Sequence, residues 1–263
     1  MRAVIAPRVT RPHSIVLLYT SIHDVFTPSF EPAGSYYTES GMKIIGHRGS
    51  RGLAPENTIA SIEKAIKHGV DEVEIDVRMT KDRVAVLSHN PTIVDPSGAE
   101  LSIRHTTYAE LLRHKSDLAP LDHTIRSIAH RCPVIIEIKP GEKPGKTFEI
   151  IHYYLAKGWR LDEFRIASFD PKILAQARKE FPSITLVVNV LWSSLRARHL
   201  CRQLGTKRIS MQQRWLWRGF LRAMQRGGYE ISAFTLNNPR RAKKWAPYLY
   251  GIITDYPDRF ETK

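Results

Sequence analysis

The chain has 263 residues, 42% of them hydrophobic, which is enough to enclose a sizeable core in one large domain or two small ones. Its 40 Lys and Arg against 26 Asp and Glu give a formal charge of +14, which favours anionic partners such as phosphate groups, nucleic acid or anionic lipid. Cys132 and Cys201 lie far apart, which excludes a disulfide framework and a cysteine zinc site and fits a reducing, cytoplasmic compartment.

The first 41 residues differ from the rest of the chain. They combine three Arg and three acidic residues with scattered Pro and Gly, and they lack sustained hydrophobic periodicity. The apolar run 15–19 is too short for a secretory signal, and no run approaches the ~20 apolar residues that cross a bilayer. Met42 then opens an apolar strand directly. We therefore expect 1–41 to be an N-terminal extension outside the native fold, with translation starting at Met42; an ordered arm or a targeting segment is the alternative.

From residue 43 onward, strand-like runs alternate with helix-like runs. The predicted strands are 43–46, 73–77, 84–87, 134–139, 164–168, 184–190, 208–211, 230–236 and 251–254. The predicted helices are 57–68, 107–114, 121–131, 147–158, 171–180, 193–204, 215–226 and 239–248. This alternation indicates a parallel sheet covered by helices.

Eight of these strands predict an α/β fold of the (β/α)8 TIM-barrel class over residues 42–263. The surplus run, 84–87, follows a turn that leaves no room for a crossover helix. A doubly wound open sheet is the alternative, although no glycine fingerprint of a dinucleotide site supports it.

The segment from Glu74 to His89 has the most informative polar pattern. Glu74 and Asp76 stand two residues apart in a β-branched run, so they project from the same face of a strand. A hairpin with its tip at 81–82 would place Asp76 opposite Leu87 and Glu74 opposite His89, with partners about 5 Å apart. An imidazole beside paired carboxylates suits metal-assisted acid/base chemistry. The plain alternative is an exposed acidic strand with a loop histidine.

Further charged residues fall at the ends of other predicted strands. The first strand ends in His47 and Arg48, and the strand 134–139 carries Glu137 and Lys139 on one face. Taken singly, a loop histidine or a buried Glu-x-Lys ion pair would explain each of them. In a barrel, however, the carboxyl ends of the strands converge on one mouth, where catalysis takes place.

Together these residues predict a site for a metal and a phosphodiester. The carboxylates of Glu74, Asp76 and Glu137 would be hard oxygen ligands, suited to Ca²⁺ or Mg²⁺ rather than zinc. A divalent ion and a bound phosphodiester would leave two negative charges, which Arg48 and Lys139 would neutralise. Two histidines beside this phosphodiester fit a base and an acid for P–O cleavage.

A set of short motifs occurs in order along residues 42–263. They are His47-Arg48-Gly49, Ala54-Pro55-Glu56-Asn57-Thr58, Glu74-x-Asp76, His89, Glu137-Ile138-Lys139, Ser168-Phe169, Phe234-Thr235-Leu236-Asn237 and Ile252-Ile253-Thr254-Asp255. In order and spacing they resemble the glycerophosphodiester phosphodiesterases, in particular the short bacterial cytosolic type. The resemblance implies a TIM barrel of the phospholipase-C-like phosphodiesterase type, with a short insertion after the His89 arm.

The resemblance also implies an activity in lipid and glycerol metabolism: hydrolysis of a glycerophosphodiester to sn-glycerol 3-phosphate and an alcohol, assisted by Ca²⁺ or Mg²⁺. The implied roles are His47 and His89 as the acid/base pair, Glu74, Asp76 and Glu137 as metal ligands, and Arg48 and Lys139 as phosphate-binding residues, with Glu56, Phe169 and Phe234 as secondary site residues. Alternatively, Glu56 only starts a helix, with Asn57 as its cap.

Three departures from the family pattern concern the alcohol side of the site. Asn90 stands where the family usually has Asp, residues 91–100 replace an Arg- and Thr-rich segment, and Phe234 stands where Trp or Tyr is common. None removes a proposed catalytic group, so the departures leave the preferred head group open.

The C-terminal half is strongly basic. Residues 191–245 hold thirteen Lys and Arg and a single acid, Glu230, and residues 214–222 alternate cationic with aromatic side chains. Peripheral contact with an anionic membrane is one interpretation, and an amphipathic barrel helix with a solvated basic face is the other. No nucleic-acid recognition motif is present, so we expect no nucleic-acid partner.

Two enzymes and one binding protein remain as alternatives to the hydrolase: a lysophospholipase D, a cyclising phospholipase or lyase of the same barrel class, and a protein that binds anionic lipid or phosphate without turnover. The retention of both histidines and all three acids argues against the last.

Overall fold

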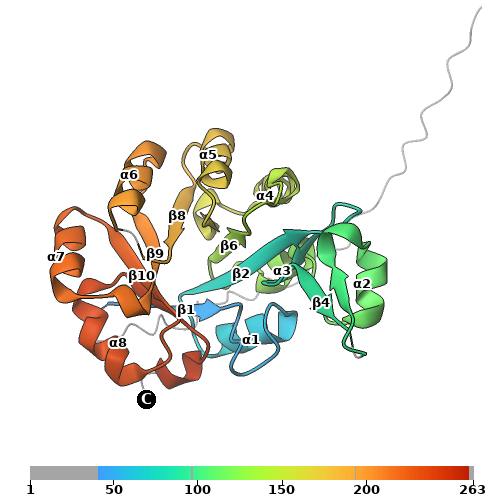
Figure 1. The fold of residues 1–263 in the computed structure, drawn as a ribbon, viewed down its shortest axis with the longest axis horizontal. Helices are drawn as coiled ribbons and strands as arrows, with labels where there is room; N and C mark the ends of the chain where they lie inside the picture. The colour runs from blue at the N-terminus through green and yellow to red at the C-terminus, as the bar shows by residue number, and fades with distance from the viewer. Residues whose placement is uncertain (1–40, 96, 193, 261–263) are drawn as a thin grey trace, which may run out of the picture. The chain divides into compact units, whose positions relative to one another are not determined.

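The computed structural model describes residues 41–95, 97–192 and 194–260, which form a closed barrel of parallel strands ringed by helices (Figure 1). The barrel strands are β1 Lys43–His47, β2 Glu72–Met79, β6 Val134–Ile138, β7 Phe164–Ser168, β8 Thr185–Val190, β9 Arg208–Gln212, β10 Glu230–Phe234 and β11 Gly251–Thr254. Because β1 pairs with both β2 and β11, the sheet closes on itself. The predicted barrel is confirmed, and the open-sheet alternative is wrong.

The outer helices follow the strands in alternation. They are α1 Ile59–Lys67, α3 Leu121–Ile128, α4 Gly145–Ala156, α5 Pro171–Glu180, α6 Ser194–Leu204, α7 Arg218–Arg226 and α8 Pro239–Trp245. In the part of the chain that the structure describes, no helix combines the length and apolar character needed to cross a membrane. The expected extension, 1–41, lies outside the described residues except for Gly41.

Helix α1 begins at Ile59, two residues after the start of the predicted helix 57–68. Its N-cap is Thr58, whose side chain accepts from the backbone N–H of Ser61, while the Ser61 hydroxyl accepts from the backbone N–H of Thr58. The expected cap, Asn57, is wrong, because this residue lies in the left-handed region at φ 56° and its side chain turns toward β2. Because Thr58 and Ser61 form the cap, the side chain of Asn57 can contact Asp76 on β2 instead.

The turn after β2 contradicts the expected hairpin register. Strand β3, Ala85–Leu87, pairs antiparallel with β2 and places Leu87 opposite Val77 instead of Asp76. Arg83 adopts φ 64°, and the backbone N–H of Thr80 bonds the carbonyl of Val84, so the turn holds one residue more than predicted. A shift of one residue reverses the face of every side chain. His89 therefore lies beyond β3 and is not a cross-strand partner of Glu74.

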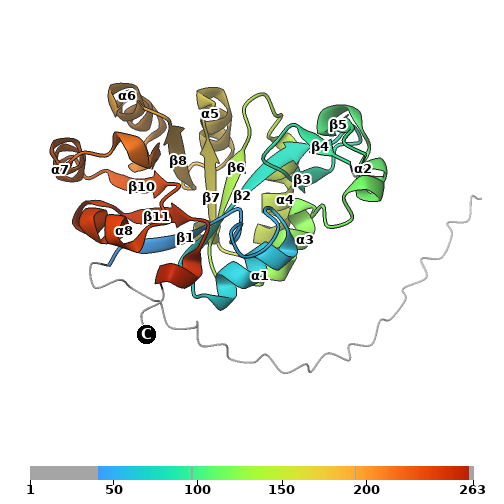
Figure 2. The same cartoon turned by 60° about the horizontal axis from the view of Figure 1, so that its bottom comes forward.

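An insertion follows β3 and lies outside the ring of helices (Figure 2). It contains a two-stranded hairpin, β4 Thr92–Val94 and β5 Glu100–Ser102, and helix α2, Tyr108–His114. Its own small core consists of Val86, Ile93, Ile103, Leu111 and Leu118. The hairpin was not predicted, because its strands are three residues long and too short to show a period.

Helix α7 begins at Arg218, three residues after the start of the predicted helix 215–226, so it holds only the second half of the basic, aromatic segment 214–222. Arg214 and Trp215 lie in a short 3-10 helix before it. Phe220 and Leu221 are buried against the barrel, whereas Trp215 and Trp217 remain exposed. This arrangement agrees with the amphipathic barrel helix. Contact with an anionic membrane stays a prediction.

The interior of the barrel is layered. An ionic layer at the amino ends of the strands holds Glu72, which pairs with Arg165 and Arg208 and accepts from the hydroxyl of Tyr250. An apolar layer above it consists of Ile45, Ile135, Ala167, Val187 and Ile253. The carboxyl ends form a second polar layer, which lines the mouth. The apolar layer separates the two charged layers, so neither layer can neutralise the charge of the other.

Replacement of Glu72 tests the ionic layer. We expect Glu72→Ala to lower the free energy of unfolding by about 3–5 kcal/mol, because the two arginines would remain buried without their counter-ion. Urea denaturation monitored by circular dichroism measures the change.

Glu230→Gln is the matched control, because Glu230 also contacts Arg208, at 3.6 Å, but its side chain is 50% exposed. We expect it to cost less than about 1 kcal/mol. Equal losses in the two variants would contradict a special contribution from the buried layer.

Candidate active site

The carboxyl ends of the strands surround a cavity of about 580 Å³. Nine of the ten predicted site residues line it: His47, Arg48, Glu74, Asp76, His89, Glu137, Lys139, Phe169 and Phe234. Glu56 does not line the cavity, but it contacts Arg48. The structure thus brings the predicted residues together, whereas their chemical roles remain predictions.

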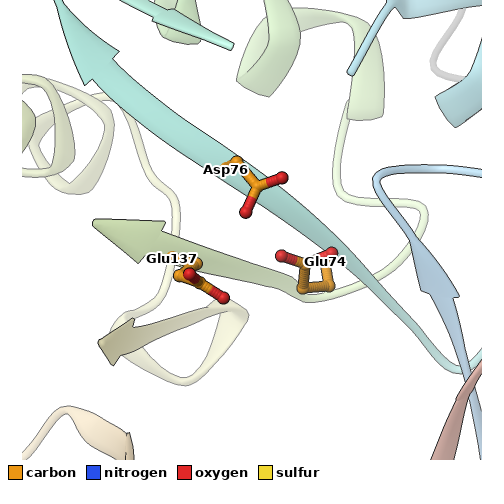
Figure 3. A group of neighbouring side chains, drawn as sticks. All are labelled: Glu74, Asp76 and Glu137. Carbon is orange, nitrogen blue, oxygen red and sulfur yellow. The ribbon is translucent and has the colours of Figure 1, made fainter. Parts of the chain in front are cut away.

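The carboxylates of Glu74, Asp76 and Glu137 lie at the centre of this mouth (Figure 3). One carboxylate oxygen from each residue lies within 4.8 Å of the others, and all three residues are buried. The strand register produces this arrangement, because Asp76 stands beside Glu137 on β6 and Glu74 stands beside His47 on β1. Within the described part of the chain, this is the one group of acids and histidines that meets the geometry of a metal site.

Burial of three like charges shifts their proton equilibria. Burial, followed by the charges of Asp76 and Glu137, raises the pKa of Glu74 well above its usual value. Burial and the charge of Asp76 also raise the pKa of Glu137. Burial opposes ionisation of Asp76 too, but Lys139 and Arg48 outweigh it and lower its pKa. The cluster therefore holds more negative charge than its two cations balance, as a site for a further cation does.

Lys139 and Arg48 are those two cations. Nζ of Lys139 lies 2.6 Å from Asp76 and 2.5 Å from Glu137. Burial opposes its charge, but these two carboxylates raise the pKa of Lys139 above its usual value, so it remains an ammonium. The Arg48 guanidinium lies 3.0 Å from Asp76 through Nε and donates from Nη1 to Glu56 at 2.8 Å. Glu56 therefore contacts the site through Arg48.

The turn after β1 fixes the backbone beside Glu74. Arg48 and Gly49 both have positive φ, and the backbone N–H of Arg48 donates to Glu74 at 2.9 Å. A Cβ at position 49 would lie 2.4 Å from the Ser61 hydroxyl, so only glycine fits this close approach to α1. The His-Arg-Gly sequence thus places an imidazole, a guanidinium and an amide donor at one corner of the mouth.

His47 is oriented by a residue that was not among the predicted site residues. Its Nδ1 lies 2.6 Å from Asp255, and Asn237 donates to the other carboxylate oxygen of Asp255 at 2.8 Å. Burial opposes ionisation of Asp255, but the bonds from His47 and Asn237 lower its pKa, so it accepts and Nδ1 carries the proton. Nε2 of His47 is therefore the nitrogen that can exchange a proton with a ligand.

His89 has a neutral partner instead. Its Nδ1 lies 2.9 Å from Oδ1 of Asn90, the position where the family usually has Asp. Arg78 holds the backbone of His89, with Nε and Nη2 donating to its carbonyl at 3.1 and 2.8 Å. Burial lowers the pKa of both site histidines, which favours neutral rings near pH 7.

Two asparagines complete the support of the carboxylates. Asn57 donates to Asp76 at 3.0 Å and accepts from its backbone N–H at 3.1 Å. Asn189, on β8, donates to Glu137 at 2.9 Å, and its Oδ1 has no hydrogen-bond partner among the described residues although it is buried at the cavity wall. This oxygen and the acidic triad form a set of hard donors that fits a Ca²⁺ or Mg²⁺ ion.

The supporting residues gave only weak signals in the sequence. Asp255 follows the last strand, so its place at the barrel mouth could have been inferred. Arg78 stands two residues after Asp76 and shares its face of β2. Asn57 stood in the motif 54–58 but was expected only as a helix cap, and Asn189 carried no signal, because their contacts depend on a left-handed turn and on strand register.

Comparisons with known proteins identify the family of this chain. The family model described as "Glycerophosphoryl diester phosphodiesterase family" matches residues 47–259. YhdW of Bacillus subtilis, provisionally named a glycerophosphodiester phosphodiesterase, is 27% identical over 82% of this chain and 96% of its own length.

Two solved structures are also similar to this chain. A phosphodiesterase of Oleispira antarctica, solved in complex with the product sn-glycerol-3-phosphate, is 26% identical with a TM-score of 0.73, over 83% of this chain and 94% of that one. A glycerophosphodiester phosphodiesterase of Thermotoga maritima, at 24% identity, shares the fold with a TM-score of 0.69, over 83% of this chain and 96% of that one.

The different partners of the two histidines lead to a test. We expect Asp255→Asn to lower the pKa of His47 further, because it removes the carboxylate that favours the imidazolium. We expect Asn90→Asp to raise the pKa of His89, because it adds such a carboxylate. Titration of the imidazole resonances by NMR measures both. Asp162→Asn, at an exposed carboxylate, is the control; an unchanged His47 in Asp255→Asn would refute the pairing.

Proposed function

The chain belongs to the glycerophosphoryl diester phosphodiesterase family and is an enzyme, and from the geometry of its mouth we propose that it uses a divalent metal and two histidines to hydrolyse glycerophosphodiesters. The products are sn-glycerol 3-phosphate and an alcohol. The observation that carries the proposal is the convergence of His47 and His89 with the buried carboxylates of Glu74, Asp76 and Glu137 around one cavity.

The two histidines transfer the protons of the reaction. The oxygen of a water molecule bonds to phosphorus while the bond from phosphorus to the alcohol oxygen breaks. One imidazole enters the step neutral and accepts a proton from the water at Nε2. The other enters the step as the imidazolium and donates its Nε2 proton to the departing alcohol, so atoms and charge balance. Both rings carry a proton on Nδ1, bonded to Asp255 or to Asn90, and this leaves Nε2 of each for the transfer.

Glu74, Asp76 and Glu137 would hold the metal, with Asn189 beside Glu137. When bound, a divalent ion supplies positive charge next to the phosphoryl oxygens as negative charge develops on them. Arg48 and Lys139 bind the phosphate oxygens in the proposal, which is supported by their position at the wall of the cavity and by their fixed charge. Ca²⁺ and Mg²⁺ both suit carboxylate oxygens.

The proposal extends to the location and the extent of the enzyme. Residues 42–263 would form the catalytic domain, since the family match covers 47–259. A cytoplasmic location is supported by Cys132 and Cys201, which are both buried and free.

Metal dependence is tested by chelation. We expect activity on glycerophosphocholine to disappear with EDTA and to return with Ca²⁺ or Mg²⁺. Glu74→Gln should also weaken binding of the metal measured directly by calorimetry, because it removes one of three charged ligands. Full activity in EDTA would contradict the proposed metal.

Removal of either catalytic histidine tests the proton transfers. We expect His47→Ala and His89→Ala each to lower kcat by about 10²–10⁴-fold, the usual contribution of a positioned acid or base. The matched control is His199→Ala, which replaces an exposed histidine of α6 outside the cavity and should keep full activity. Full activity in either site variant would refute the two-histidine mechanism.

The nature of the product separates hydrolysis from cyclisation. Attack by water gives sn-glycerol 3-phosphate directly, whereas attack by the neighbouring glycerol hydroxyl gives a cyclic phosphate. We expect phosphorus NMR of the reaction on glycerophosphocholine to show the monoester without a cyclic species at any time. Accumulation of the cyclic phosphate would assign the chain to the lyase alternative.

A further inference from the structure

A polar groove adjoins the catalytic cavity where β9 and β10 end. It consists of two hollows of about 350 and 330 Å³, which share Gln213, Thr235 and Arg241 as lining residues and so form one space. Gln212, Phe234 and Thr235 line both this groove and the cavity. The groove therefore leads outward from the cavity, and a ligand bound in the cavity can extend into it.

The groove is positively charged, and we call it the basic groove after Arg214, Arg241 and Arg259, which line it. None of the described residues at its walls is acidic. Within the described ranges of the chain, none of the three guanidinium groups pairs with a carboxylate. Three positive charges thus face the groove without counter-charge from the protein.

The arginines of the catalytic cavity differ in this respect. Each of them forms an ion pair with a carboxylate of the protein; they are Arg48, Arg51 and Arg78. Their positive charge is therefore offset in part within the protein, whereas that of the basic groove is available to an anionic ligand.

Two of the groove arginines are held by neighbouring residues. The guanidinium of Arg259 lies over the ring of Tyr256, 3.7 Å from its centre, and donates to the backbone carbonyl of Asn237 at 3.4 Å. The backbone N–H of Arg241 donates to the side chain of Asn238, which caps α8, at 3.1 Å. Because these contacts already fix part of the groove, less ordering is required when an anion binds.

We propose that the basic groove binds a second anionic group, a phosphate or a carboxylate, on the leaving alcohol of the substrate. The inference rests on the proposed function, because it takes the position of the diester phosphate from it, and it deepens that function by naming the class of head group. The glycerol arm of a glycerophosphodiester carries only hydroxyl groups, so the second anion belongs to the leaving alcohol. Arginine binds the oxygens of both anions through paired N–H donors, whereas a cationic head group such as choline would be repelled.

Binding of bisphosphates tests the groove without turnover. Butyl phosphate and butane-1,4-diol bisphosphate, and the corresponding hexyl pair, are titrated into the metal-loaded enzyme by calorimetry at low ionic strength. We expect the bisphosphate of at least one pair to bind about fivefold or more tightly than its monophosphate, of which a factor of two is statistical, and this advantage to fall as salt is added. In Arg241→Gln the advantage should fall to about the statistical twofold, since Arg241 lines both hollows of the groove.

Arg240→Gln is the matched control, because it removes the same charge from the neighbouring position. Arg240 is also exposed, but it lines neither the basic groove nor the cavity. This variant should retain the full advantage of the bisphosphate. Equal losses in the two arginine variants would assign the gain to the overall charge of +14 and would overturn the proposal, as would a merely statistical advantage in the native enzyme.

Turnover then identifies the anion. Three diesters of glycerol 3-phosphate are compared, whose leaving alcohols have the same length and end in a methyl group, a carboxylate or a phosphate. We expect kcat/KM for at least one charged diester to exceed that for the methyl-terminated diester about fivefold or more in the native enzyme and in Arg240→Gln, but not in Arg241→Gln. A gain confined to the phosphate would identify a phosphate monoester as the ligand, and a gain for both would identify anions in general.

The same comparison separates the inference from the proposed function. Equal kcat/KM for all three diesters would overturn the inference, while hydrolysis of the methyl-terminated diester would uphold the proposed function. Absence of all hydrolysis, with the advantage of the bisphosphate intact, would refute the proposed function alone.

Discussion

The charge balance at the mouth of the barrel is the constraint on which the rest of the site depends. Three carboxylates are buried within 4.8 Å of one another, and burial of unpaired charge would cost several kcal/mol per ion. Lys139 and Arg48 offset part of this cost, but they supply two positive charges against three acids. The excess of negative charge that remains, together with burial, raises the pKa values of Glu74 and Glu137. Such an imbalance is unfavourable for folding and favourable for binding a cation and, through it, a phosphodiester.

The supporting residues show how the fold maintains this unfavourable arrangement. Asp76 is held by Asn57 from the turn before α1, Glu137 by Asn189 from β8, and His47 by Asp255 from the end of β11. These supports come from segments far apart in the chain, and Asp255 is itself held by hydrogen bonds with Asn237. A group held from several elements keeps its orientation when a ligand arrives, so less ordering is required on binding.

The apolar layer of the barrel separates two ionic clusters with different consequences. At the amino ends, Glu72 has two arginines and a tyrosine hydroxyl as partners. Burial opposes ionisation of Glu72, but the charges of Arg208 and Arg165 outweigh burial and lower its pKa below the usual value. The protein itself supplies the charged partners of that cluster. At the carboxyl ends the acids outnumber their cations, and the cluster faces an open cavity. Similar residues thus serve structure at one end and ligand binding at the other, and the difference lies in whether the protein supplies all of the counter-charge.

The sequence by itself determined the class of fold and the residues that are proposed to carry the chemistry. Alternating strand and helix periods indicated the barrel, and charged residues at the ends of neighbouring strands indicated the mouth. Both patterns can be read from the sequence because each depends only on residues close together in the chain. Tertiary structure alone decided the contacts of these residues. The extra residue in the turn at Arg83 changed the hairpin register, so that His89 reaches the cavity from beyond β3 and not from a strand opposite Glu74. Asn57 is not the helix cap that the sequence suggested, and its side chain holds Asp76 instead. The hydrophobic period of a segment does not encode the conformation of a turn, the register between two strands or the packing of distant elements. These features depend on contacts across the whole chain.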